Sequence, residues 1–136
     1  MTAFVLSAVL GFLSALHIYW AVGGHWGRAI AVPQVDDRPA FTPSRLATVL
    51  VAVGLAFAAV IPLVRAGVLS VPAPAWLSQG AASLLALVFF IRAIGDFHLV
   101  GFFKQVRSTS FARWDTRLFS PLSLLLSLGF VRVATL

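Results

Sequence analysis

Residues 46–64 read LATVLVAVGLAFAAVIPLV, a run without a single charged side chain. A helix needs about 20 mostly apolar residues to cross the hydrocarbon core of a bilayer, because each residue adds about 1.5 Å. Thr42 and Pro43 stand just before the run and are typical of a helix start. The stretch therefore predicts a membrane-spanning helix over residues 43–64.

Three further segments pass the same test of length and hydropathy. The first lacks the basic start and short apolar core of a secretory signal. The last begins at Ser120-Pro121, and Arg132 near its end is long enough to reach the head groups. The predicted fold is all-α, an integral membrane four-helix bundle in a single domain, residues 1–136. The expected helices cover residues 2–22, 43–64, 75–94 and 120–136.

The composition leads to the same class of protein. Of 136 residues, 60% are hydrophobic and 10% are charged, whereas an ordinary soluble domain is about 25% charged. The formal net charge is +6, but the cations flank apolar segments, which indicates membrane topology and not a nucleic-acid partner. The chain has no cysteine, which excludes disulfides, iron–sulfur clusters and cysteine-ligated zinc.

The cations are distributed unequally between the connections of the predicted helices. Two lie on one side, Arg65 and Arg132. Eight flank the two long connections, residues 23–42 and 95–119, and these are Arg28, Arg38, Arg45, Arg92, Lys104, Arg107, Arg113 and Arg117. The positive-inside rule therefore predicts a multi-pass protein of the bacterial inner (cytoplasmic) membrane, with both long loops in the cytoplasm and both termini outside.

The acids and histidines share this side with the eight cations. They are Asp36, Asp37, Asp96, Asp115, His25 and His98, with His17 near the same end of the first helix. Membrane topology requires one-sided Arg, but it does not require one-sided Asp and His. The asymmetry therefore indicates that something cytoplasmic is bound, paired or processed at this face.

His17 is the ionisable residue that lies deepest in a predicted span, one to two turns from its end. Such a residue costs free energy within a membrane and is a functional candidate for that reason. The alternative is a neutral imidazole that bonds to a neighbouring helix. Trp20 lies on the same helix face at i+3, and together with Tyr19 it also fits an aromatic belt at the membrane interface.

A second group of polar residues follows the third predicted helix. Arg92 and Asp96 are four residues apart and would form an ion pair on one face if the helix continued through Gly95. The aromatic and aliphatic residues of 97–103, followed by Lys104, are typical of a segment that lies in the membrane interface.

Both groups of residues resemble the motifs of a known family. The first reads His17-x-Tyr19-Trp20-x-x-Gly23-Gly24-x-Trp26-Gly27; the second combines Arg92-Ala93-x-Gly95-Asp96-Phe97, Val100-Gly101-Phe102-Phe103-Lys104 and Thr109-x-Phe111-Ala112-x-x-Asp115-Thr116 with Ser120-Pro121. Together they resemble a family of short bacterial four-helix membrane proteins catalogued as a domain of unknown function, over the whole chain. The resemblance implies the fold, the location and one shared site, and it supplies no activity, substrate or cofactor.

The leading functional hypothesis is a ligand pocket at the cytosolic membrane interface. The first and third predicted helices run in the same direction, so His17 and Arg92 would lie at one membrane level and line one cavity if those helices are neighbours. The pocket would take an amphiphile or an anionic small molecule, with Arg92 as the anion clamp. The predicted ligand-binding residues are His17, Trp20, Trp26, Arg92, Asp96 and Lys104.

Several alternatives stay open at this point. A membrane-embedded enzyme would use His17 as acid or base, with Asp96 or Asp115 to orient it, although no catalytic sequence motif supports a reaction class. An accessory subunit would dock a partner membrane protein, or a second copy of the chain, through the two long loops. No metal is predicted because no histidine pair has the i, i+4 spacing of helical ligands. No cofactor is predicted either, and the expected partner is the lipid bilayer.

Overall fold

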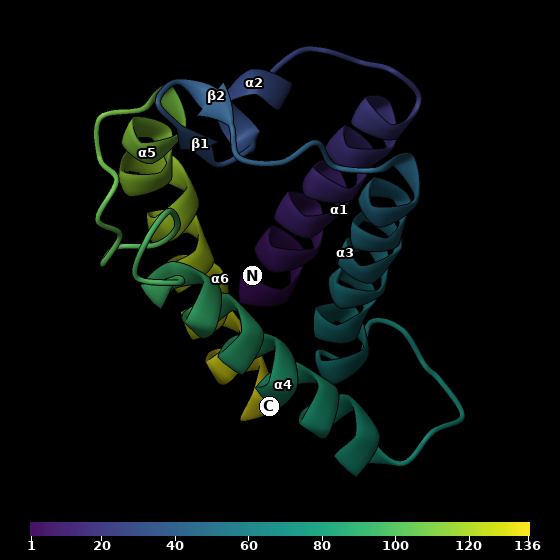
Figure 1. Ribbon diagram of the computed structural model, residues 1–136. Helices are drawn as coiled ribbons and strands as arrows, with labels where there is room; N and C mark the ends of the chain where they lie inside the picture. The colour runs from purple at the N-terminus through teal and green to yellow at the C-terminus, as the bar shows by residue number, and fades with distance from the viewer.

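The computed structural model describes residues 1–136 and is mostly helical (Figure 1). Four helices are long and apolar enough to cross a membrane: α1 (Thr2–Ala21), α3 (Arg45–Arg65), α4 (Ala75–Ile94) and the continuous helix Ser110–Ala134. The last comprises α5 (Ser110–Trp114), a π-helical turn η1 (Asp115–Phe119) and α6 (Ser120–Ala134). Short elements join α1 to α3, namely α2 (Arg28–Ala31), β1 (Gln34–Val35) and β2 (Arg38–Pro39). The predicted all-α class is confirmed, with this small antiparallel sheet added.

The predicted helices lie close to the bounds of α1, α3, α4 and α6, and the fourth continues a longer helix that begins at Ser110. Thr109 caps this helix, since its hydroxyl oxygen accepts a hydrogen bond from the Ala112 N–H at 3.1 Å. Pro121 follows a turn in which the Ser120 N–H donates to the Asp115 carbonyl, five residues back. A proline lacks an N–H and its ring clashes with the carbonyl of residue i−4, and such a wider turn accommodates both defects. The Ser120-Pro121 pair thus marks a π-bulge inside a helix.

The long helices pack in two pairs, α1 with α3 and α4 with α6 (Figure 1). Serine hydroxyls connect the helices of each pair, because Ser7 donates to the Ala59 carbonyl at 2.6 Å and Ser127 donates to the Ala86 carbonyl at 2.7 Å. Small residues let the backbones approach this closely. The core of the molecule combines residues of all four helices: Leu6, Leu10, Ala58, Ala82, Ala86, Leu126, Phe130 and Val133.

Most apolar side chains point away from this core. Only 22 of the 136 residues are buried, and large groups such as Phe57 (71% exposed) and Leu125 (65% exposed) lie on the outer surface. A soluble protein does not expose apolar surface on this scale, whereas hydrocarbon tails solvate it without cost. The four apolar helices and their outward-facing side chains therefore fit a short membrane protein.

The two ends of the bundle differ in structure. One end, called the loop end here, consists of residues 22–44 and 95–114, and Figure 1 shows α2, β1 and β2 extending across it toward α5. The two segments are joined there, since the Phe111 N–H donates to the Gln34 side chain at 3.2 Å. The opposite end, the terminal end, holds Met1, Leu136 and the 66–74 connection. Each end carries a cavity described below.

Candidate functional site

A buried carboxylate organises one half of the loop end. Asp115 is fully buried in η1. One of its oxygens, Oδ1, accepts from Arg92 Nη2 at 2.8 Å. The other, Oδ2, accepts from the Gly101 N–H at 2.8 Å, Lys104 Nζ at 3.1 Å and Ser120 Oγ at 3.1 Å. We call these five residues the Asp115 cluster.

The two cations of the Asp115 cluster are bonded differently. Lys104 is buried, and its ammonium also donates to the Gly101 carbonyl at 3.0 Å and to Thr116 Oγ1 at 2.6 Å, so all three of its protons have partners. Arg92 is partly exposed, but its Nη1 atom is buried without a hydrogen-bond partner. Two cations thus share one carboxylate, and the cluster carries one uncompensated positive charge.

The predicted ion pair between Arg92 and Asp96 is wrong. Helix α4 ends at Ile94, and Gly95, with φ of +88°, turns the chain out of the helix. Asp96 Oδ1 accepts instead from the backbone N–H groups of His98, Leu99 and Val100, at 2.9, 2.8 and 2.9 Å. Desolvation raises the pKa of Asp96, but these three N–H donors outweigh it and hold the pKa below its usual value of 3.8.

Two glycines allow this loop to close against the end of α4. A Cβ atom at Gly95 would overlap the Val100 backbone, and one at Gly101 would overlap the Ile94 carbonyl. The close approach is held by the Phe102 N–H, which donates to the Ala93 carbonyl at 2.8 Å. Residues 95–104 of the second motif therefore fold as a closed loop that brings Gly101 and Lys104 to Asp115.

The first motif block forms a compact turn after α1. Tyr19 Oη accepts from the N–H groups of His25 and Trp26 at 3.3 Å each, and Trp20 Nε1 donates to the Trp26 carbonyl at 2.7 Å. Gly24 lies against the Tyr19 ring, where a Cβ atom would collide with it. Trp26 takes part through its backbone, while its indole is exposed. These aromatic and glycine residues fix the turn, and His17 is left free of it.

His17 has one ring nitrogen that is bonded and one that is not. Its Nδ1 lies 2.7 Å from the Leu13 carbonyl. A carbonyl only accepts, so Nδ1 carries a proton, and in the neutral imidazole Nε2 then keeps its lone pair. The ring meets Trp20 edge to face at 5.0 Å between centroids, which leaves Nε2 available to a ligand in the space beside the helix.

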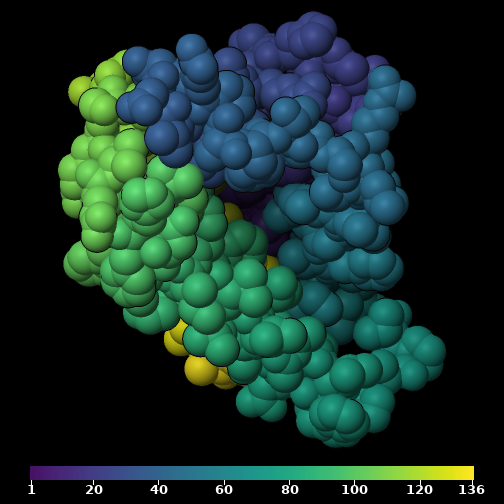
Figure 2. All heavy atoms as spheres, viewed as in Figure 1, coloured from purple at the N-terminus to yellow at the C-terminus, as the bar shows by residue number.

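That space is a pocket of about 240 Å³ between α1, α2 and α3, which we call the α1–α3 pocket. Two of the predicted binding residues, His17 and Trp20, line it. Arg28 lines it as well, although the sequence did not indicate this residue. Its walls are formed by His17, Trp20, Arg28, Ala31, Val32, Phe41, Pro43, Ala47, Thr48 and Val51, six of them hydrophobic. The hollow visible in Figure 2 lies between the segment leading into α3 and helix α4, and α4 contributes no residue to the α1–α3 pocket.

The structure places the predicted site residues in two separate groups. His17 and Trp20 belong to the α1–α3 pocket, while Arg92 and Lys104 belong to the Asp115 cluster and Asp96 closes the loop beside it. The groups are separate because α1 packs on α3, and α4 packs on α6. No sequence pattern indicated that Arg28 would belong to a site. It reaches the pocket because Gly27, with φ of +74°, turns α2 back toward α1.

No three His or Asp residues of the chain converge on one point. In comparisons with known proteins, no curated protein and no solved structure matches the chain. One family model does match, over residues 10–130, and its description reads "Protein of unknown function (DUF3995)". This match covers most of the chain and both motif blocks, and it shows that the chain belongs to the DUF3995 family.

Proposed function

We propose that this protein spans the inner membrane four times and binds an amphiphile with an anionic head group in the α1–α3 pocket. The observation that carries the proposal is the make-up of the pocket: apolar walls, one free imidazole nitrogen on His17 and one arginine, Arg28. Ligand sites commonly combine an apolar lining with a few such polar groups.

Arg28 is the group best suited to bind the anion. Its guanidinium makes no hydrogen bond or ion pair within the protein, and it lies beside the pocket at the start of α2. A guanidinium presents its donors in a planar fork that matches a carboxylate or a phosphate. His17 Nε2 would accept from a hydroxyl of the same head group. Arg28 thus takes the role of anion clamp that the sequence had suggested for Arg92.

The size of the pocket limits what lies inside it. At about 240 Å³ it is slightly below the usual range of about 300–1,000 Å³ for ligand pockets. A head group and the first carbons of one chain would fill it, and the rest of the chain would extend into the bilayer. The excess of cations at the loop end supports a cytoplasmic position for this end, and hence a ligand from the inner leaflet.

The contacts favour binding over acid–base catalysis. Asp96 is bonded to backbone N–H groups and Asp115 to Arg92 and Lys104, so neither carboxylate orients His17. The His17 ring is held by a backbone carbonyl of its own helix. We therefore infer that the Asp115 cluster stabilises the structure of the loop end and does not take part in a reaction.

Isothermal titration of the detergent-solubilised protein with dodecyl phosphate tests the proposal. Arg28→Gln should weaken binding by about tenfold or more, as expected for a lost hydrogen bond between charged groups. Arg38→Gln is the matched control, because Arg38 is exposed at the same end and lies outside the pocket. Dodecyltrimethylammonium, with the opposite charge, should bind weakly to all three proteins.

Equal binding by the Arg28 and Arg38 variants would overturn the proposal. So would equal affinity for the anionic and cationic amphiphiles. If neither amphiphile binds and the loops capture a membrane protein partner instead, the accessory-subunit alternative replaces the pocket.

A further inference from the structure

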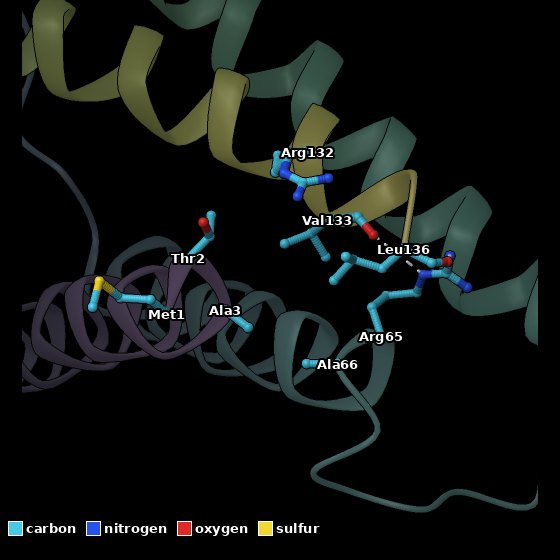
Figure 3. Close-up of a pocket in the computed structure, with 8 residues that line it drawn as sticks. All are labelled: Met1, Thr2, Ala3, Arg65, Ala66, Arg132, Val133 and Leu136. Atoms are coloured by element: carbon cyan, nitrogen blue, oxygen red, sulfur yellow. Dashed lines mark hydrogen bonds between the residues drawn. The ribbon is translucent and has the colours of Figure 1, made fainter.

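The terminal end carries a second cavity, of about 430 Å³, which lies between α1, α3 and α6 (Figure 3). Its lining contains both arginines of this end of the molecule. The residues around it are Met1, Thr2, Ala3, Arg65, Ala66, Arg132, Val133 and Leu136. We call it the terminal cavity.

One of the two arginines has a structural role. Arg65 Nε donates to the Val133 carbonyl at 3.4 Å, and its Nη2 donates to the carbonyls of Ala134, at 3.2 Å, and Leu136. The last carbonyls of a helix have no partner within the helix, and a cation at this position also interacts favourably with the helix dipole. Arg65 therefore fastens the end of α6 to α3 and builds one wall of the cavity.

The other arginine has no such role. The Arg132 side chain is exposed and makes no hydrogen bond or ion pair with any residue of the chain. Figure 3 shows it on α6, across the cavity from the Thr2 side chain on α1. An arginine that satisfies nothing in the protein is free to bind a ligand in the cavity that it lines.

The electrostatics of this end favour an anion. No acidic residue lines the cavity. Asp36 and Asp37 form the turn between β1 and β2, and Asp96 and Asp115 lie beyond α4 and in η1, so all four acids are at the loop end. No acidic side chain therefore lies beside Arg132, whereas Arg65 is already bonded to the main-chain oxygens of Val133, Ala134 and Leu136, so an anion in the cavity would interact chiefly with Arg132.

We propose that the terminal cavity binds a phosphate group, with Arg132 as its main ligand. The guanidinium would pair with two phosphate oxygens, the Thr2 hydroxyl would donate from the facing wall, and Arg65 would add positive charge. The phosphate is either inorganic phosphate or the phosphodiester of a lipid head group, which present the same oxygens. This site is at the opposite end from the α1–α3 pocket and does not depend on it.

The test is a calorimetric titration of the full chain in a maltoside detergent and a phosphate-free buffer. Inorganic phosphate and short-chain dihexanoylphosphatidylglycerol are titrated separately, at matched ionic strength because salt screens exposed charges. Arg132→Gln should weaken binding of the ligand that occupies the cavity, either inorganic phosphate or the lipid, by about tenfold or more. Arg117→Gln is the matched control, because Arg117 is also exposed and unpaired on the same long helix.

Each outcome decides the matter. Binding of inorganic phosphate that depends on Arg132 supports a site for the free ion, and dependence seen only with the lipid supports a head-group site. Equal affinity of the Arg132 and Arg117 variants, or no binding of either ligand, overturns the proposal. The Arg132 variant loses no internal hydrogen bond, so its circular dichroism spectrum should match that of the unchanged protein.

Discussion

Asp115 joins two helices and a loop through one side chain, and this makes it the most sensitive residue at the loop end. Asp115→Ala would leave Lys104 buried without a counterion, and Arg92 would lose its only ion pair. Loss of one partner of a buried ion pair costs about 3–5 kcal/mol. We expect the free energy of unfolding in detergent, measured by denaturant titration, to fall by about that amount.

A second variant separates the charge from the packing. In Asp115→Ala combined with Lys104→Met, no ammonium is left unpaired, so the double variant should be more stable than the sum of the two single changes predicts. Strict additivity would show that the buried pair contributes no coupling energy.

Asp96 gives the loop a dependence on pH. Its pKa in the folded protein lies below the unfolded value of 3.8, because three backbone N–H groups donate to the charged form. The stabilisation is therefore complete above pH 3.8 and is lost as the pH falls through the folded pKa.

Comparison of the unchanged protein with Asp96→Ala as a function of pH tests this expectation. The difference in thermal midpoint should be largest near neutral pH and should shrink below about pH 3.8. A difference that stays constant with pH would mean that the carboxylate charge does not stabilise the loop. The titration of Asp115 is common to both proteins and cancels in the comparison.

Helix α3 presents two faces whose requirements differ. Ala58 is buried at the packed face of the helix, and Ala56, two residues before it, is exposed. Ala58→Leu inserts extra volume into a packed core, which costs about 1–3 kcal/mol, whereas Ala56→Leu should change stability by less than about 0.5 kcal/mol. Unfolding in a denaturing detergent measures both, and equal effects would contradict the packing of the helix pairs.

The helices show which features a local pattern can predict. Residues 46–64 lie within a helix that begins at Arg45, because length and hydropathy alone specify such a segment. The predicted start of the fourth helix coincides with that of α6, but the helix continues back to Ser110, because the Ser120-Pro121 signal also suits a π-bulge and because Asp115 is a charge within this longer helix. Arg92, 23 residues away in the sequence, pairs with Asp115 and offsets the free-energy cost of burying this charge. Spacing along the chain cannot reveal such a contact.

The candidate site was harder to predict for the same reason. Tyr19 and Trp20 also fit an aromatic belt at the interface, and Trp20 is a predicted ligand-binding residue; in the structure their polar atoms are bonded within the turn that follows them. His17 and Trp20 line the α1–α3 pocket, and the helix that faces them there is α3 and not α4. Which helices are neighbours decides the site, and a hydropathy pattern does not contain that information.

The sidedness of the whole molecule can be tested directly, because the chain has no cysteine. Ser108→Cys places a thiol at the loop end and Ser70→Cys places one at the terminal end, both at exposed positions. The excess of cations at the loop end predicts that a membrane-impermeant maleimide labels the Ser70→Cys variant in intact cells. It should label the Ser108→Cys variant only in inverted vesicles. The reverse pattern would overturn the proposed orientation and place the α1–α3 pocket in the outer leaflet.

The pairing of the helices also sets the order in which the chain can assemble during its synthesis. The α1–α3 pair is complete once Arg65 has left the ribosome, whereas α4 must wait for α6, the last helix of the chain. At a rate of about 5–20 residues per second, the stretch from Ile94 to Ala134 takes roughly 2–8 s to translate. During that interval the face of α4 that carries Ala82, Ala86 and Ala93 has no packing partner within the chain. At this stage the nascent protein can bind a chaperone or a second copy of itself through that face.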